Sequence, residues 1–448
     1  MIGIVMFFAA LAMLLIGFPV AFTFGAVSVF FGLAAGVIEA FQDQIPLMEG
    51  LVDTGINMFA FMPFRIYSIM QNTILMAVPL FIFMGVILQK TGLAEKLLES
   101  MGSLFGKMRG GVAISTVLVG SLLAASTGVV GASVVAMGVI SLPVMLKYNY
   151  DKRLATGVIC ASGTLGQIIP PSIVLIILGD VFQVPVGDLF KAAVFPGLTL
   201  VGAYVLYIVV VSYFNKDLAP AIPVDEDAGT KIRQIITALK AIIPPLVLIV
   251  LVLGSIFAGI ATPTESAAVG SVGAMLLAFM YRVFSIKLLK DAALETSKVT
   301  AMVFAILIGA TAFSMVFTYT GGDQIVEEVM MSLPGDKWGF IIVSMMVIMF
   351  LGFFIDFVEI SYIIVPILVP IAINLGINPV WYAILIAMNL QTSFLTPPFG
   401  FSLFYLRGVA PPSVRTIDIY KGVIPFIAIQ LVVLAIVVIE PGWFGIDF

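Results

Sequence analysis

The sequence SGTLGQIIPPS, Ser162–Ser172, places two adjacent prolines and several small polar residues inside an apolar stretch long enough to cross a bilayer. A second stretch, NLQTSFLTPPFG at Asn389–Gly400, has the same character and also ends an apolar run in a proline pair. Proline removes a backbone N–H and clashes with the preceding turn, so each pair is expected to unwind a helix. Unwound backbone at membrane depth is tolerated where it lines a polar cavity. Two broken spans in corresponding positions therefore predict a transport site near the membrane midplane.

The composition is that of a polytopic membrane protein. The 448 residues are 61% hydrophobic and 10% charged, with a mean hydropathy of +1.20, whereas soluble domains carry about 25% charged residues. The sequence has no histidine and one cysteine, Cys160, so the usual transition-metal sites, a Ser/His or Cys/His couple and an intrachain disulfide are unavailable. The net charge of -4 gives no basic surface for nucleic acid. We therefore expect an all-α membrane protein that is not an enzyme and has no organic cofactor.

Apolar segments of about 17 to 25 residues divide the chain into two sets of five spans. The first set lies within residues 1–213 and the second within 241–448, and a polar cytoplasmic linker and helix start occupy 214–240. Each set also contains an apolar stretch interrupted by small or polar residues, at about 112–146 and 338–374, which we interpret as re-entrant helical hairpins. The expected spans are 3–18, 20–37, 71–89, 153–180 (broken), 189–213, 241–260, 263–282, 299–319, 380–406 (broken) and 421–440.

The two sets are related as a sequence repeat. The alignment that places Pro170 on Pro397 also places Pro143 on Pro370, and a slightly longer offset further upstream pairs Gly92 with Gly321. Five spans is an odd number and a hairpin returns to its own side, so the second repeat is expected to be inverted. The fold class predicted is an all-α inverted five-plus-five repeat with one hairpin and one proline-broken helix in each half.

The distribution of basic residues sets the orientation. With the expected spans, 18 of the 21 Lys and Arg fall on one side of the membrane. The other side receives only Arg65, Lys191 and Lys337. Because cytoplasmic loops are enriched in Lys and Arg, the first side is cytoplasmic. The expected location is the bacterial inner membrane, with both termini in the periplasm.

Two amphipathic stretches flank the third span of each repeat, at Leu51–Asn72 and Ser285–Val299. One interpretation is an interfacial helix that anchors the chain at the level of the lipid headgroups. The other is a brace that connects a fixed part of the protein to a moving part.

Oxygen atoms gather where the backbone is expected to be unwound. Hydroxyl and carbonyl oxygens without competing thiols or imidazoles suit Na⁺, and helix N-termini at such breaks favour an anionic substrate group. The alternative is that these hydroxyls bond to carbonyls of their own helices and that the glycines permit close packing. The candidate substrate-binding residues are Ser126, Thr127, Gly128, Gln167, Pro170, Pro171, Asp356, Thr396, Pro397 and Pro398. The candidate Na⁺ ligands are Ser162, Gly163, Thr164, Asp356, Gln391, Thr392 and Ser393.

Asp356 and Glu359 lie at the interruption of the second hairpin. Ionisable groups at membrane depth are costly and usually functional, so Asp356 is a candidate for binding an ion, a substrate or a proton. The alternative is that both carboxylates lie near the outer surface and are solvated. The role of Glu359 stays open.

The chain resembles the large membrane (M) subunit of the tripartite ATP-independent periplasmic (TRAP) transporters over essentially its whole length. The resemblance rests on GQIIPPS at Gly166–Ser172, TPPFG at Thr396–Gly400, ATPTESAAVG at Ala261–Gly270, and the turn Ser126, Thr127, Gly128. It implies Na⁺-driven import of an organic acid that a soluble periplasmic substrate-binding protein delivers. It also implies a small membrane subunit of about four helices and an elevator mechanism, in which hairpins and broken spans slide against a fixed scaffold.

Three other functions remain as alternatives. A stand-alone Na⁺/dicarboxylate symporter would share the same physical features but would need no binding protein. An intramembrane enzyme is disfavoured because the sequence has no histidine and no acid pair placed in two facing spans. A passive channel is disfavoured because two hairpins that meet at the midplane are typical of closed gates.

Overall fold

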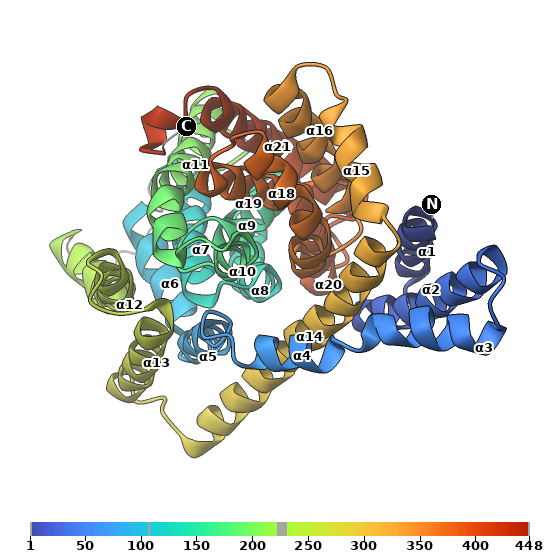
Figure 1. Cartoon of the computed structure of the whole chain (residues 1–448). Coiled ribbons are helices and arrows are strands. Elements are labelled where there is room, and N and C mark those ends of the chain that lie inside the picture. Colours follow the sequence, from blue (N-terminus) through green and yellow to red (C-terminus); the bar gives the residue numbers. More distant parts are fainter. Residues whose placement is uncertain (1, 106–107, 222–230, 447–448) are drawn as a thin grey trace. The chain divides into compact units, whose positions relative to one another are not determined.

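The computed structural model describes residues 2–105, 108–221 and 231–446, in which every regular element is a helix (Figure 1). Within these ranges, eight helices are long and apolar enough to cross a membrane, or nine if the bent pair Ala77–Lys90 and Glu95–Gly102 is one span. The protein is therefore a multi-pass membrane protein, as the composition predicts. Most of the expected linker, residues 222–230, lies outside the described residues.

The helices form two compact units, each made of two segments of the chain. Unit one contains Met1–Leu75 and Lys298–Pro379, and unit two contains Met76–Ser297 and Val380–Phe448. The helices of unit one are α1 (Ile2–Ile16), α2 (Val20–Gln42), α3 (Leu47–Gly50), α4 (Met62–Met70), most of α14 (Ile286–Tyr319), α15 (Gly322–Met331), α16 (Asp336–Leu351), α17 (Phe357–Glu359) and α18 (Val365–Asn374). Those of unit two are α5 (Ala77–Lys90), α6 (Leu93–Phe105), α7 (Gly111–Thr127), α8 (Val130–Lys147), α9 (Lys152–Thr164), α10 (Ile173–Phe182), α11 (Val186–Phe214), α12 (Lys231–Phe257), α13 (Pro263–Met280), α19 (Pro379–Leu395), α20 (Phe401–Val409) and α21 (Thr416–Ile439).

Both expected amphipathic stretches differ from the structure. The stretch Ser285–Val299 and the span after it form one continuous helix, α14, of 34 residues. Neither glycine nor proline occurs between residues 286 and 308, so nothing in the sequence ends the helix there. The other amphipathic stretch is not one regular helix, because a π-helical segment (Leu51–Ile56) and a 3₁₀ turn (Asn57–Phe59) precede α4.

Two short helices, α6 and α15, lie in regions where no element was expected. Each follows a glycine with positive φ: Gly92 (φ 64°) after α5 and Gly321 (φ 71°) after α14. A left-handed glycine ends the preceding helix and allows the chain to turn. These are the two glycines that the sequence repeat pairs.

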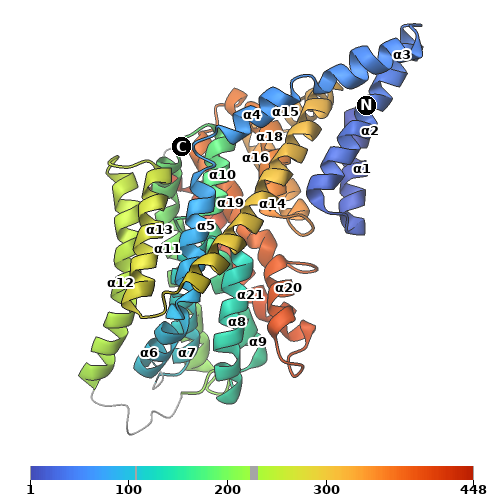
Figure 2. The same cartoon turned by 90° about the horizontal axis from the view of Figure 1, so that it is seen from below.

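The first halves of the two broken spans form the core of unit two. Every residue of α9 from Leu154 and every residue of α19 from Trp381 is buried. The hairpin arms α7 and α8, together with α20 and α21, pack around α9, while α13 contacts both α5 and α12 (Figure 2). The helices that carry the proline breaks are therefore shielded from lipid by protein, which is where irregular backbone can persist in a membrane.

The base of the first hairpin is closed by hydrogen bonds. The Val112 N–H donates to the Tyr150 hydroxyl (3.4 Å). The chain after α11 adds two more bonds, because the Gly110 N–H donates to the Ala219 carbonyl (3.0 Å) and the Asp151 N–H to the Leu218 carbonyl (2.9 Å). The hairpin is thus held at its open end, and its turn lies at the other end, inside unit two.

Candidate functional site

The first proline break interrupts a buried helix for eight residues. After α9 ends at Thr164, the chain makes a 3₁₀ turn (Leu165–Gln167) and passes through a cis peptide between Pro170 and Pro171 before α10 begins. The Ser172 hydroxyl donates to the Gln167 carbonyl (2.6 Å) and accepts from the Leu175 N–H (3.5 Å). This one side chain therefore caps α10 and bonds to the far side of the break.

The second break has the same construction. The peptide between Pro397 and Pro398 is also cis, and α20 begins at Phe401. Here the Ser402 hydroxyl donates to the Phe394 carbonyl (2.8 Å). Phe394 and Gln167 each lie three positions before the first proline of their pair. In both breaks, then, the equivalent carbonyl accepts a hydrogen bond from a serine near the start of the resumed helix.

The turn of the first hairpin lies directly against the first break. A Cβ atom built on Gly128, the left-handed residue that ends α7 (φ 61°), would lie 3.1 Å from Ile173 Cγ1. Further along α7, a Cβ on Gly120 would lie 2.6 Å from the Ser162 hydroxyl oxygen. These glycines allow the hairpin backbone to approach the break without an intervening side chain.

The structure thus places the expected turn residues beside the expected break residues. The Thr127 hydroxyl is buried and bonds to the Ser133 hydroxyl (2.9 Å). The side chain of Ser126, the third candidate in this turn, lies outside the described residues. The N-termini of two helices, α8 and α10, adjoin this region, which gives it the partial positive charge that suits an anionic group.

The hydroxyls expected to bind Na⁺ are buried, and each donates its proton to a carbonyl of its own helix. Ser162, Thr164, Thr392 and Ser393 donate to Ile159 (3.1 Å), Ala161 (2.9 Å), Met388 (2.8 Å) and Leu390 (2.8 Å), respectively. Thr396 donates to the Thr392 carbonyl (2.7 Å). The alternative interpretation, in which the hydroxyls serve only helix packing, predicts these hydrogen bonds. A hydroxyl that has donated its proton still has oxygen lone pairs for a cation, so both interpretations fit this geometry.

Two buried glutamines lie at or near the breaks. Gln167 and Gln391 are fully buried. Among the described residues, neither the amide nitrogen nor the amide oxygen of Gln167 has a hydrogen-bond partner, whereas the Gln391 side chain lies beside the Tyr204 hydroxyl. Leaving a buried polar group unsatisfied costs about 1 to 3 kcal/mol, and native proteins rarely do so. The unpartnered Gln167 amide at the first break is therefore a candidate for binding a polar ligand.

The second hairpin lies in unit one, where a loop at residues 352–356 separates α16 from α17. Asp356 is half-buried at the end of this loop, and its carboxylate accepts from the Phe357 N–H (2.8 Å), so it caps the second arm. Glu359 follows within the arm and is 3% exposed, and its Oε2 atom has no hydrogen-bond partner among the described residues. The structure thus gives Asp356 a local structural role and leaves the buried Glu359 oxygen available to a ligand.

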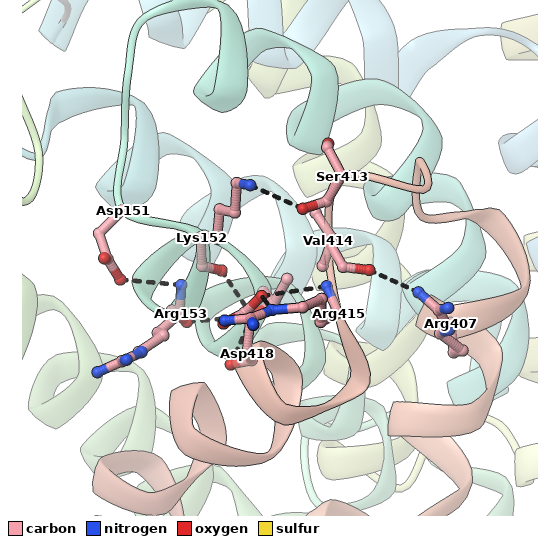
Figure 3. A network of polar contacts seen from close by, with 9 residues as sticks. Asp151, Lys152, Arg153, Arg407, Ser413, Val414, Arg415 and Asp418 are labelled. Atoms are coloured by element: carbon pink, nitrogen blue, oxygen red, sulfur yellow. Dashed lines mark hydrogen bonds and ion pairs between the residues drawn. The ribbon is translucent and has the colours of Figure 1, made fainter.

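A polar network fixes the N-terminal end of the first broken span (Figure 3). Asp151 caps α9 by accepting from the Arg153 and Leu154 N–H groups (2.9 and 3.1 Å). Lys152 donates to the Ser413 carbonyl (2.7 Å), which links α9 to the loop before α21. Sequence reasoning did not single out these contacts. An aspartate directly before a helix is a capping signal, but the distant partner of Lys152 is set by packing.

The same loop is held from its other side. Arg407, in α20, donates to the Val414 carbonyl (2.5 Å). Arg415 forms an ion pair with Asp418 at the start of α21 (3.4 Å). Both broken spans are therefore attached to one loop at this end of unit two (Figure 3).

An all-helical membrane protein with two buried helices broken at proline pairs has the features of a transport permease. The family comparison makes this specific: residues 5–443 match the family described as "Tripartite ATP-independent periplasmic transporter, DctM component". The chain belongs to this family and is a large permease of the TRAP type, as the sequence motifs indicate.

Relatives of known name cover nearly the whole chain. The C4-dicarboxylate TRAP transporter large permease protein DctM of Pseudomonas aeruginosa is 32% identical over 392 residues, which are 86% of this chain and 90% of that protein. The sialic acid TRAP transporter large permease protein SiaM of Vibrio cholerae is 28% identical over 87% of this chain and 88% of its own length. The isethionate TRAP transporter permease protein DctMQ of Oleidesulfovibrio alaskensis is 30% identical over 95% of this chain but only 65% of that protein.

A solved structure shares the fold. The crystal structure of the YdaH transporter of Alcanivorax borkumensis, described as having an unusual topology, superposes with a TM-score of 0.59. The match covers 87% of this chain and 89% of that chain at 13% sequence identity. At this identity the likeness concerns the fold alone.

Proposed function

We propose that the protein is the permease subunit of a Na⁺-coupled importer of an organic acid, a carboxylate such as a dicarboxylate or a sugar acid. A periplasmic substrate-binding protein hands the acid over. The observation that carries the proposal is the pair of proline breaks in buried helices, the first of which contains the fully buried Gln167, whose amide atoms lack partners among the described residues. The printed names of two relatives, a C4-dicarboxylate and a sialic acid permease, support a carboxylate substrate.

In this proposal Na⁺ is a transported ion with one site at each break. The oxygens of Ser162, Gly163 and Thr164 form the first site. Those of Gln391, Thr392 and Ser393 form the second. Buried hydroxyl, amide and carbonyl oxygens are hard ligands of the kind an alkali cation prefers. Asp356, in the second hairpin, is proposed separately as a ligand for an ion or the substrate.

The substrate carboxylate is proposed to bind at the hairpin turn and the breaks. Thr127 and Gly128 adjoin the N-terminus of α10, where backbone N–H groups and the helix dipole favour negative charge. The Gln167 amide nitrogen supplies a donor that has no partner among the described residues. The set is completed by the other expected residues of the two motifs: Ser126, Pro170, Pro171, Thr396, Pro397 and Pro398.

The transport cycle is proposed to be of the elevator type, on an inverted five-plus-five repeat. One observation supports the repeat. In each break, a serine after the proline pair donates its hydroxyl proton to the carbonyl three positions before that pair. A small membrane subunit of about four helices would complete the fixed scaffold. The relative named DctMQ supports such a partner, since this chain matches 65% of that protein's length.

The test is transport into liposomes by the purified complex, with the small subunit and the binding protein present. Uptake of a radiolabelled dicarboxylate or sugar acid should require an inward Na⁺ gradient and the binding protein. Uptake that persists without the binding protein would favour the stand-alone symporter. Uptake driven equally well by K⁺ would contradict Na⁺ coupling.

A further inference from the structure

Unit two contains an apolar cavity. Its volume is about 560 Å³, and α6, α7, α11 and α12 supply most of its wall. Among the described residues that line it, one side chain is polar, Ser121, and its hydroxyl donates to the Leu118 carbonyl (2.8 Å). The side chains of this wall thus offer no free hydrogen-bond donor, so the occupant must be apolar.

The cavity can be reached from the lipid-facing side of the helices. Three lining side chains lie at its edge and are largely exposed: Leu198 of α11 is 58% exposed, and Leu246 and Val250 of α12 are 44% and 58% exposed. Other lining residues, such as Ile249 (6%), are buried. The cavity therefore runs inward from a surface that faces the bilayer.

Its length matches one leaflet of a membrane. On α12 the lining residues run from Ile242 to Leu253, a rise of about 16 Å at 1.5 Å per residue. Half of a hydrocarbon core is about 15 Å. Lys240, exposed two residues before the first lining position, marks the headgroup end, because basic side chains near helix ends extend to the interface.

A single flexible hydrocarbon chain fits both the length of the cavity and its apolar wall.

We propose that this cavity binds one acyl chain of a membrane phospholipid, with the headgroup at the level of Lys240. The wall also includes Ile169 and Pro170 from the first proline break. A bound chain would therefore pack directly against the break, and its removal would leave that part of the break without a packing partner.

The test uses the full chain in vesicles of phosphatidylethanolamine and phosphatidylglycerol that contain a phosphatidylglycerol with a diazirine in one acyl chain. After illumination, mass spectrometry should find cross-links to peptides of α7 and α12 that line the cavity. Leu246→Trp fills the mouth and should reduce this labelling about tenfold, since roughly two methylene groups of chain are displaced. Leu251→Trp is the matched control: Leu251 is on the same helix and 64% exposed but does not line the cavity, so labelling should stay at the wild-type level.

A second measurement needs no variant. Excess unlabelled long-chain phosphatidylglycerol should suppress labelling of the cavity peptides in the wild-type protein, while a short-chain analogue should not. Equal labelling in the two tryptophan variants, or equal competition by both lipids, would overturn the proposal. Loss of labelling when the small membrane subunit is added would also overturn it, because a protein side chain would then fill the cavity.

Discussion

Val129 and Asp356, which the sequence repeat pairs, occupy the same structural position: each is the N-cap residue of the second arm of its hairpin. The same alignment places Pro143 inside α8 and Pro370 inside α18, and it pairs the two proline pairs at the breaks. The two halves of the chain therefore share local architecture. They differ in chemistry at the cap, where an apolar residue in one half is replaced by a carboxylate in the other.

The cap position gives the first prediction. Asp356→Asn keeps one acceptor oxygen for the Phe357 N–H and removes the charge, so folding should be preserved. If the carboxylate binds Na⁺, the Na⁺ concentration for half-maximal uptake should rise about tenfold. A changed substrate preference would instead indicate a contact with a substrate hydroxyl, and a flattened pH profile would indicate a proton role. Wild-type values in all three measurements would mean that Asp356 serves only as a helix cap.

The second prediction concerns the buried hydroxyls at the breaks. Ser162→Ala or Thr164→Ala should weaken the Na⁺ response at one site, and Thr392→Ala or Ser393→Ala at the other. Each lost ligand should cost roughly 1 to 3 kcal/mol, which is about tenfold in apparent Na⁺ affinity.

Ser212→Ala is the matched control for these variants. Ser212 is also buried and donates to a carbonyl of its own helix (Ile208, 2.6 Å), but it lies in α11, away from the breaks in sequence. An unchanged Na⁺ response in all four break variants would show that their hydroxyls serve helix packing, as the alternative interpretation holds.

The third prediction uses the unpartnered amide of Gln167. Gln167→Leu replaces an unsatisfied polar group by an apolar group of similar size, so the thermal unfolding temperature should stay the same or rise. Uptake should nevertheless fall at least about tenfold, because the ligand loses its hydrogen-bond partner. A variant with normal uptake would remove Gln167 from the site.

Gln430→Leu serves as the contrasting case. The Gln430 amide nitrogen donates to the buried Tyr204 hydroxyl (2.7 Å), so the variant loses this buried hydrogen bond. The variant should therefore be less stable by about 1 to 3 kcal/mol, as measured by denaturation in detergent. Opposite stability changes at the two glutamines would separate a ligand-binding amide from a structural one.

The fourth prediction concerns topology. A cysteine in place of Glu328, exposed on α15, should react with a membrane-impermeant thiol reagent added outside intact spheroplasts. A cysteine in place of Asp217, exposed after α11, should not. The native Cys160 is buried, so labelling of the protein without an added cysteine measures the background reaction. Labelling at Asp217 but not at Glu328 would reverse the orientation inferred from the positive charges.

The sequence by itself determined the features that depend on local chemistry. Apolar runs of membrane length identified a multi-pass membrane protein, because a bilayer forces the backbone to satisfy its own hydrogen bonds over about 20 residues. The proline pairs Pro170-Pro171 and Pro397-Pro398 located both breaks, because proline removes a backbone hydrogen bond and clashes with the preceding turn. Proline alone does not decide the outcome, since Pro244 and Pro245 lie inside α12 without ending it. No sequence signal marks residue 299, where we expected a new segment to begin but α14 continues. The sequence also did not reveal α6 and α15, because these helices are shorter than a membrane span.

Only the tertiary structure decided how the candidate residues are used. The bond from Ser172 to the Gln167 carbonyl, the approach of Gly120 to Ser162 and the link from Lys152 to Ser413 join parts of the chain whose contact no local pattern encodes. The same holds for Gln167, which sequence reasoning ranked with nine other candidates. Its amide is distinguished by being buried without a partner among the described residues, and that depends on every side chain packed around it. Burial and hydrogen bonding are properties of the whole fold, whereas helix spans and their breaks are properties of a short stretch of sequence.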